Sequence, residues 1–365
     1  MMPISPAVTP SPRREGSPFG ANLRIAALGG GTGLPNVLRG LCALLYAGSS
    51  KAHQTLPNDR LVGIVTTTDD GGSSGRLRRE FGVLPPGDIR NCLAALAEDQ
   101  SMITALFQYR FEAGEGLNGH ALGNLMLTAL TEVTGDFVKA VDIAARVVGA
   151  RGRVVPVTVD QVALSAELTD GRTISGETAI VQSGTPIQRL SLTPAEPRCV
   201  DTALDALRKA DVIVAGPGSL YTSVLPPLLM PDVIDAIRLA EATRVYVLNL
   251  MTEPGETEGY DAVRHLEVVR EHLGFQPFGH LIFNTAPIPS HLESAYGERG
   301  AMPIRIANSD LAALRDMGVQ PLGAPLACEG PVGRIRHHPG RLAAAILACA
   351  RFGARQPLRF REGSH

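Results

Sequence analysis

The chain has 365 residues, a formal net charge of −2 at pH 7 and 44% hydrophobic residues, which fits one large soluble α/β domain or two. Tryptophan is absent, aromatic residues make up only 4% and there is no basic excess, so a nucleic-acid-binding surface is not expected. The five cysteines are scattered without a C-x-x-C pair, which argues against a zinc or disulfide framework.

Residues 1–22 are rich in proline, serine and glycine and contain no apolar segment typical of a secretory signal. We predict that they form a disordered tail and that residues 23–355 form a single α/β domain. No apolar run approaches the roughly 18 residues needed to cross a membrane. We therefore expect a cytoplasmic protein without membrane insertion.

A repeated unit of apolar run, turn and helical segment dominates the chain. The apolar runs are Leu23–Leu28, Leu61–Val65, Val212–Ala215, Val245–Leu248 and Leu281–Phe283. Such alternation predicts a Rossmann-like, doubly wound parallel sheet. Ligands of these sheets bind at the carboxyl ends of the strands, near the topological switch point. The unusual loops of this sequence all follow these strands, so we predict one composite site.

The pattern changes in residues 86–195, which we predict to be an inserted subdomain. Four consecutive helices are expected at 86–96, 101–109, 120–132 and 137–148. Residues 153–192 then alternate apolar and polar side chains around an Asp-Gly pair, which predicts a hairpin or small meander.

A glycine-rich loop follows the first predicted strand and opens a helix. It contains Gly29, Gly30, Gly31, Thr32 and Gly33. The N-terminus of a helix offers unpaired N–H groups and a positive dipole end to a phosphate. The loop does not match the dinucleotide fingerprint, and no Walker A sequence occurs. A tight turn for strand–helix packing is the alternative interpretation.

The loop after the second strand reads Asp-Asp-Gly-Gly-Ser-Ser-Gly-Arg. Asp69 and Asp70 suit Mg²⁺ with phosphate oxygens completing its shell, and they equally suit hydroxyl recognition without a metal. Ser73 or Ser74 could instead cap the following helix. We favour a binding role for Arg76 because it lies close to the strand end.

Three polar residues of the predicted insertion are further candidates. Asp88 fits the first turn of a helix, where an acid is favourable. Arg90, two residues later, could form a bidentate hydrogen bond with a phosphate. We favour the role at the helix start for Asp88, and an exposed ion pair is an equal alternative for Arg90. Asn124 interrupts an apolar helix and needs a partner for its amide, either a ligand or a buried structural bond.

A second phosphate-type loop follows the strand at 212–215. Gly218, Ser219 and Tyr221 belong to this loop, which places four hydroxyls within the five residues 219–223. Tyr260, in the loop after the next strand, could stack on a base or bond a sugar, or simply pack.

Taken together, these motifs resemble the gluconeogenesis factor family, the YvcK-like proteins of bacteria, which are related to the 2-phospho-L-lactate transferases. The similarity is carried by LGGGTGL (28–34), TTTDDGGSSGRLR (66–78), PPGDIRN (85–91), GHALGNL (119–125), GPGSLYTS (216–223) and PGET (254–257). The resemblance implies a Rossmann-like fold, self-association as a homodimer or higher oligomer, and binding of a UDP-sugar such as UDP-N-acetylglucosamine. It also implies a role in cell shape and wall-precursor balance during gluconeogenic growth.

Most of the candidate ligand-binding residues are also implied by this resemblance. They are Gly30, Gly31, Thr32, Gly33, Asp69, Asp70, Ser73, Ser74, Arg76, Asp88, Arg90, Gly218, Ser219 and Tyr221, with Tyr260 matched less closely and Asn124 added from its own context. We expect the backbone amides of the two glycine loops to converge on one diphosphate. An Mg²⁺-dependent transferase acting on a nucleotide-linked donor is the alternative function, and a scaffold without ligand is a third.

Overall fold

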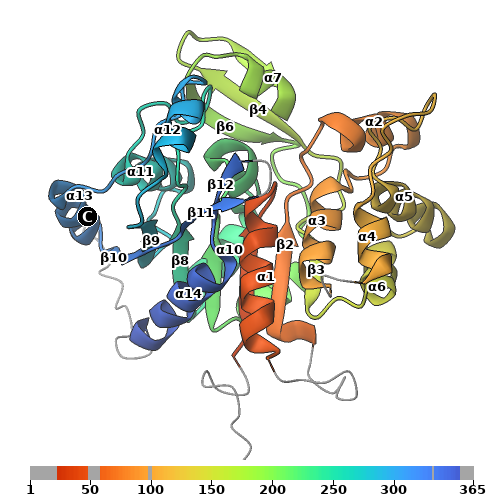
Figure 1. Cartoon of the computed structure of the whole chain (residues 1–365), viewed down its shortest axis with the longest axis horizontal. Coiled ribbons are helices and arrows are strands. Elements are labelled where there is room, and N and C mark those ends of the chain that lie inside the picture. Colours follow the sequence, from red (N-terminus) through yellow and green to blue (C-terminus); the bar gives the residue numbers. More distant parts are fainter. Residues whose placement is uncertain (1–22, 48–57, 98–100, 331–332, 354–365) are drawn as a thin grey trace, which may run out of the picture.

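The computed structural model describes residues 23–47, 58–97, 101–330 and 333–353 (Figure 1). The predicted disordered tail lies outside these residues. So do the last two residues of the predicted α/β domain.

The centre of the molecule is a sheet of seven parallel strands, which confirms the predicted α/β class. Its order is β10-β9-β8-β7-β1-β2-β3. The strands are β1 (Ile25–Gly29), β2 (Leu61–Val65), β3 (Arg153–Pro156), β7 (Val212–Ala215), β8 (Thr243–Val247), β9 (His280–Asn284) and β10 (Gln320–Ala324). The two strands beyond the predicted five, β3 and β10, are its edges.

The topological switch point lies between β1 and β7. From β1 the chain builds outward through β2 and β3, and it then returns to place β7 on the other side of β1. The connections from β1 and β7 therefore leave in opposite directions, and a crevice forms where their carboxyl ends meet. Both predicted glycine loops start at this point.

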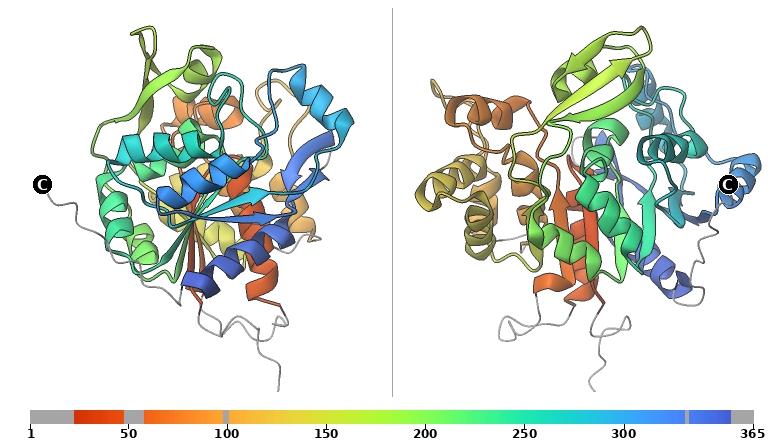
Figure 2. Two further views of the ribbon diagram at one scale, coloured as in Figure 1. Left: turned by 90° about the vertical axis from the view of Figure 1, so that its left-hand side faces the viewer. Right: turned by 180° about the vertical axis from the view of Figure 1, so that it is seen from behind.

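Helices cover both faces of the sheet, as Figures 1 and 2 show. One face packs against α1 (Gly33–Leu45), α3 (Gly87–Leu96) and α14 (Pro339–Gly353). The other packs against α8 (Asp201–Arg208), α10 (Pro231–Leu239) and α11 (Ala262–Leu273). Strand β1 is buried on both sides because its alternate residues enter two separate hydrophobic cores.

The four helices predicted for the insertion are confirmed with small shifts of their ends. Besides α3 they are α4 (Met102–Gln108), α5 (Leu122–Thr134) and α6 (Phe137–Val148). The remaining helices are α2 (Gly72–Phe81), α9 (Leu225–Leu228), α12 (Ser290–Gly297), α13 (Asn308–Asp316) and the short turns η1 (Asn58–Arg60) and η2 (Leu220–Val224). Two short strands, β11 (Ala327–Gly330) and β12 (Arg334–His337), pair as a hairpin near the end of the described chain.

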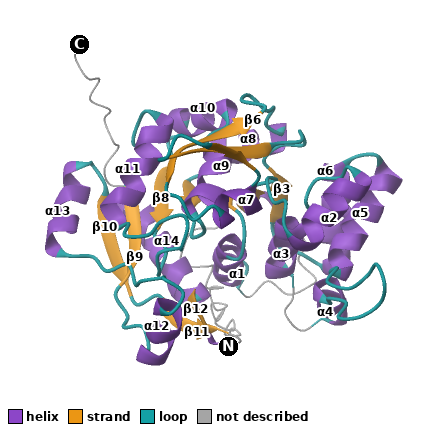
Figure 3. Cartoon of the chain, turned by 90° about the horizontal axis from the view of Figure 1, so that it is seen from above, coloured by secondary structure: helices purple, strands orange, loops and turns teal. Residues whose placement is uncertain are grey.

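A small antiparallel sheet forms a cap above the carboxyl ends of the main strands (Figure 3). The cap consists of β4 (Ala163–Leu168), β5 (Thr173–Ser175), α7 (Glu177–Gln182) and β6 (Ile187–Thr193). The predicted Asp-Gly turn joins β4 to β5. The expectation of a meander is wrong for Arg153–Pro156, because this apolar segment pairs in parallel with the open edge of β2.

No single helix among the described residues is long and apolar enough to cross a membrane. One sharply bent pair, Leu220–Leu228 with Pro231–Leu239, meets the length and composition criteria only when the two are taken together.

The close contact between the two glycine loops can be tested by adding one methyl group. A Cβ on Gly33 would lie 1.9 Å from the Pro217 carbonyl oxygen, so Gly33→Ala must push the loops apart. We expect a loss of roughly 1–3 kcal/mol in the free energy of unfolding, measured with urea. Gly297→Ala is the matched control because nothing lies within 4 Å of a Cβ at that helical position. Equal stability of the two variants would contradict the contact.

Candidate ligand-binding site

The two glycine loops meet at the switch point, as the sequence predicts. A Cβ placed on Gly218 would lie 3.8 Å from the Gly30 carbonyl oxygen, and one placed on Gly31 would lie 3.4 Å from Ser223 Oγ. Gly31 adopts a φ of 60°, which glycine accepts without strain. The loops are therefore parts of one site on the carboxyl edge of the sheet.

Two of the loop amides are already bonded within the protein. Gly31 N–H donates to Asp88 Oδ2 at 2.7 Å, and Gly218 N–H donates to Asn249 Oδ1 at 3.0 Å. Asn249 Nδ2 in turn donates to the Gly218 carbonyl at 2.9 Å. The expectation that these amides grip a diphosphate is thus wrong for Gly31 and Gly218. Both bonds instead fix the shape of the loops.

The start of α1 still offers donors to a ligand. The N–H groups of Gly33 and Leu34 in its first turn have no intrahelical acceptor, because a helix leaves its first amides unpaired, and the next residue, Pro35, has no N–H. Thr32 precedes this turn, is exposed, and makes no side-chain capping bond. An anion at this position would meet the positive end of the helix dipole.

Asp88 lies beneath the first glycine loop rather than on the surface of α3. Burial raises the pKa of its carboxyl to about 6, against the opposing effect of the Gly31 hydrogen bond. The side chain joins α3 to the loop after β1, so it holds the loop in place.

The adjacent carboxylates after β2 serve different partners. Asp69 Oδ1 accepts a hydrogen bond from Gly71 N–H at 2.9 Å, and burial raises the pKa of Asp69. Asp70 Oδ1 accepts two bonds from Thr178 in the cap, 2.9 Å from the backbone nitrogen and 2.6 Å from the hydroxyl. Asp70 therefore fastens α7 over the site.

The predicted magnesium site remains a prediction. The described residues contain no group of three or more His, Cys, Asp or Glu side chains arranged to hold a metal ion. Mg²⁺ commonly needs only one or two protein carboxylates when substrate phosphates complete its octahedral shell. Asp69 and Asp70 would fit that smaller role through the oxygens that do not accept the bonds just described.

Several predicted residues form a buried hydrogen-bond network behind the loop. Ser73 Oγ lies 3.0 Å from His120 Nδ1 and accepts from Asn124 Nδ2 at 3.0 Å, and Arg90 Nε donates to Asn124 Oδ1 at 2.9 Å. Arg90 also donates to Gln108 and Asn91. The network ties α2 and α3 to α5. The buried structural bond foreseen for Asn124 is present.

Ser74 and Arg76 stand at the edges of this network. Ser74 Oγ accepts from Gly87 N–H at 3.1 Å, so it positions the start of α3. Arg76 is half-buried and donates through Nη2 to the Asn118 carbonyl at 2.8 Å. A guanidinium has five N–H donors, so this bond leaves Arg76 further donors for an anionic ligand.

Two glutamates support the second glycine loop. Ser219 Oγ donates to Glu253. Glu256 accepts from Tyr221 N–H at 3.3 Å and from the Thr222 hydroxyl at 3.2 Å. Burial raises the pKa of both carboxyls, that of Glu256 to about 7, where the neighbouring Glu253 adds to the effect.

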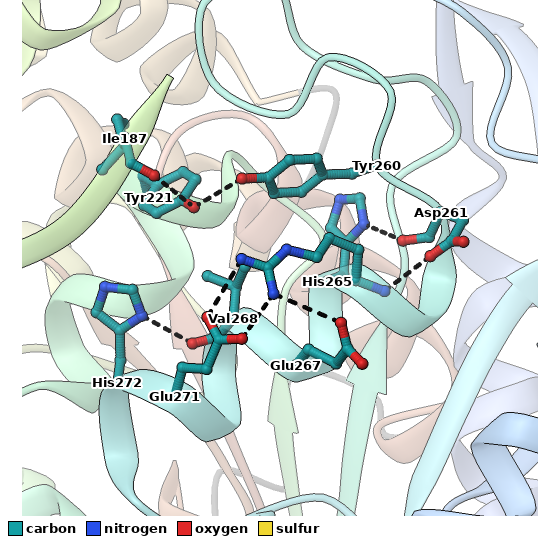
Figure 4. A network of polar contacts seen from close by, with 10 residues as sticks. Ile187, Tyr221, Tyr260, Asp261, His265, Glu267, Val268, Glu271 and His272 are labelled. Carbon is teal, nitrogen blue, oxygen red and sulfur yellow. Dashed lines mark hydrogen bonds and ion pairs between the residues drawn. The ribbon is translucent and has the colours of Figure 1, made fainter. Parts of the chain in front are cut away.

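The predicted tyrosines lie against each other at the base of the cap (Figure 4). The hydroxyls of Tyr221 and Tyr260 are 3.0 Å apart, and Tyr221 also donates to the Ile187 carbonyl of β6 at 3.4 Å. Tyr221 is 1% exposed, so it links the cap to the main domain. Tyr260 is partly exposed and packs its ring against His265 and Arg264.

Glu177 is a site residue that the sequence did not indicate. It opens α7, where Thr178 is bonded to Asp70, and so reaches the site from the cap. Burial raises its pKa to about 9, with further contributions from Asp69, Asp88, Asp70 and Glu256. No sequence signal could have placed Glu177 in the site, because in the sequence it lies within the predicted hairpin, many residues away from both glycine loops.

The raised pKa of Glu177 predicts a pH-dependent stability. Above the ordinary value of 4.5 the unfolded chain ionises this carboxyl, whereas the folded chain keeps the proton up to about pH 9. Its contribution to stability is therefore complete below pH 4.5 and falls as pH rises towards 9.

We expect Glu177→Gln to match the wild type below pH 4.5 and to gain in Tm over it as pH rises to about 9. Thermal unfolding at a series of pH values measures this difference. Glu167→Gln, an exposed substitution in the same small sheet, should show no such trend. A pH-independent difference for Glu177→Gln would contradict the burial of this carboxyl among acids.

Comparison with known proteins agrees with this architecture. Residues 25–327 match the family model of 2-phospho-L-lactate transferase CofD. A crystal structure of a Bacillus halodurans protein superposes with a TM-score of 0.82 at 40% identity, covering 89% of this chain and 99% of that one.

Named proteins with similar sequences occur in several bacteria. A putative gluconeogenesis factor of Nostoc sp. is 44% identical over 89% of this chain and 68% of its own length. The gluconeogenesis factor of Bacillus subtilis is 43% identical over 83% of this chain and 90% of its own. That of Halalkalibacterium halodurans is 41% identical over 88% and 95%. The chain therefore belongs to the CofD family, among the members called gluconeogenesis factors.

Proposed function

We propose that the protein is a cytosolic regulator that binds a nucleotide-linked sugar of the UDP-N-acetylglucosamine type. The observation that carries this proposal is the meeting of two glycine loops at the switch point, beside the free N-terminus of α1. A ligand phosphate would lie against these first-turn amides. The physiological role would be the one implied by the resemblance, in cell shape and wall-precursor balance during gluconeogenic growth.

The carboxylates around the loops suit the sugar part of such a ligand. Asp69 and Asp70 face the site from β2, and Glu177 reaches it from the cap. Carboxylates accept hydrogen bonds from hydroxyls and would repel a bare phosphate. A ligand that combines one anionic group with many hydroxyls therefore fits this site better than a free polyphosphate.

Binding of the nucleotide sugar can be measured directly by calorimetry with UDP-N-acetylglucosamine. Arg76→Ala should weaken binding by roughly 10- to 100-fold, because a charged hydrogen bond contributes about 1.5–3 kcal/mol. Arg79→Ala is the matched control, since it removes an exposed arginine one turn further along α2. Absence of heat with the intact chain would end the proposal.

A second candidate is a transferase that moves a phosphate-linked group from a nucleotide donor with the help of Mg²⁺. The family match over residues 25–327 favours this alternative. Such chemistry depends mainly on positioning and charge neutralisation, which the helix N-terminus and a metal held by Asp69 and Asp70 would supply.

Turnover of a nucleotide-linked donor that requires added Mg²⁺ would support the transferase. Asp69→Asn should abolish this turnover, while Glu80→Gln on the exposed side of α2 should leave it unchanged. Asp69 is preferred to Asp70 for this test because Asp70 also holds the cap. Turnover that persists in Asp69→Asn would exclude the metal role.

A further inference from the structure

A cavity separate from the site at the switch point opens on the flank of the molecule. It has a volume of about 800 Å³ and is formed by the end of α2, the turn between α5 and α6, the loop after β3 and the start of α8. Figure 3 shows these elements on the side where β3 forms the edge of the sheet. None of the predicted ligand-binding residues lines this cavity.

The lining combines apolar side chains with a negative charge. Leu84 and Phe137 are buried in it, while Phe81 and Val159 remain 54% and 50% exposed at its rim. Its charged residues are Glu132, Asp136, Asp160, Asp201 and Arg198. The lining thus contains four carboxylates and one guanidinium. A segment that carries both apolar and basic side chains would complement this lining.

The walls of the cavity are held by internal hydrogen bonds. Gln161 Nε2 donates to the Gly82 carbonyl at 2.8 Å, which joins the loop after β3 to the end of α2. Asp160 Oδ2 accepts from Arg198 N–H at 2.7 Å, which joins the same loop to the start of α8. These bonds join three of the four walls of the cavity to one another.

Helix α8 connects this cavity to the beginning of the described chain. Its first residue, Asp201, lines the cavity, and the helix is about 12 Å long at 1.5 Å per residue. Just beyond its last turn, Asp211 Oδ2 accepts a hydrogen bond from Arg24 N–H at 2.7 Å. Residues 1–22 therefore join the domain one short helix away from the cavity.

We propose that residues 1–22 bind in this cavity in cis. An extended chain covers about 3.3 Å per residue, so the five residues from Arg24 back to Phe19 reach about 16 Å, enough to pass along α8. Phe19 then meets the near edge of the cavity, and Arg13 and Arg14 lie over its carboxylates. The segment carries two arginines against one acid, Glu15, and apolar Val8 and Phe19 lie on either side of them, so it has both basic and apolar side chains.

The other end of the chain is less well placed for this cavity. Residues 354–365 also contain arginines, but they follow α14, which packs against α1 on the opposite face of the sheet from α8. A second copy of the chain could offer residues 1–22 in trans. A fluorescence experiment distinguishes binding of residues 1–22 in cis from both of these alternatives.

The absence of tryptophan from this chain makes Phe19→Trp a single fluorescent reporter. In the full chain we expect its emission at a shorter wavelength, and its quenching by acrylamide weaker, than in a free peptide of residues 1–22. Glu132→Lys should lower the equilibrium constant for binding by roughly two- to fivefold, the usual range for an exposed charge pair. Arg13→Glu with Arg14→Glu in the otherwise unchanged chain should weaken binding further, because the carboxylates of the cavity would then repel both residues.

Three controls make the result decisive. Glu241→Lys adds the same charge change at an exposed position outside the cavity and should leave the signal unchanged. Removal of residues 354–365 should also leave it unchanged, and loss of the signal there would overturn the proposal. Emission that matches the free peptide would overturn it as well. A signal that rises with protein concentration would overturn binding in cis in favour of a second copy.

Discussion

The site depends on one close backbone contact, between the start of α1 and the loop after β7. Gly33 approaches the Pro217 carbonyl so closely that no side chain fits between them. Parallel strands at a switch point send their connections to opposite faces, and a crevice normally separates them. Here glycine lets the two loops approach each other closely beside this crevice, which sets the positions of Thr32 and of the α1 amides.

Polar side chains then fix the loops that the glycines bring together. Asp88 bonds the first loop and Asn249 bonds the second, each through a backbone amide. The desolvation of a carboxylate favours its protonated form, which explains why burial raises the pKa values of Asp88, Glu177 and Glu256 together. A cation or a hydroxyl-rich ligand would therefore suit these acids better than a further anion.

The cap is joined to the main domain on two sides of the site. Asp70 holds α7 through Thr178. On the other side, His272 Nε2 accepts from Leu190 N–H at 2.9 Å, and Tyr221 donates to the neighbouring Ile187 carbonyl. These bonds cross between segments distant in sequence, so the cap and the loops form one structure around the same volume. Residues predicted as ligand contacts, notably Tyr221, Asp70 and Arg90, here support the architecture of the site.

The sequence by itself determined the class of fold, five of the seven strands of the main sheet, the helices of the insertion and the two glycine loops, because these follow from local periodicity and from residue types with strong backbone preferences. It also identified the family, through motifs that are contiguous in the chain. Only the tertiary structure decided which donors are free and which acids share the site. Folding brings together residues that are distant in sequence, and no local pattern predicts that they meet. The pairs are Gly31 with Asp88, Asp70 with Thr178, and Glu177 with Glu256. Hydrogen bonding and burial between distant segments are properties of packing, and packing is settled only when the whole chain folds.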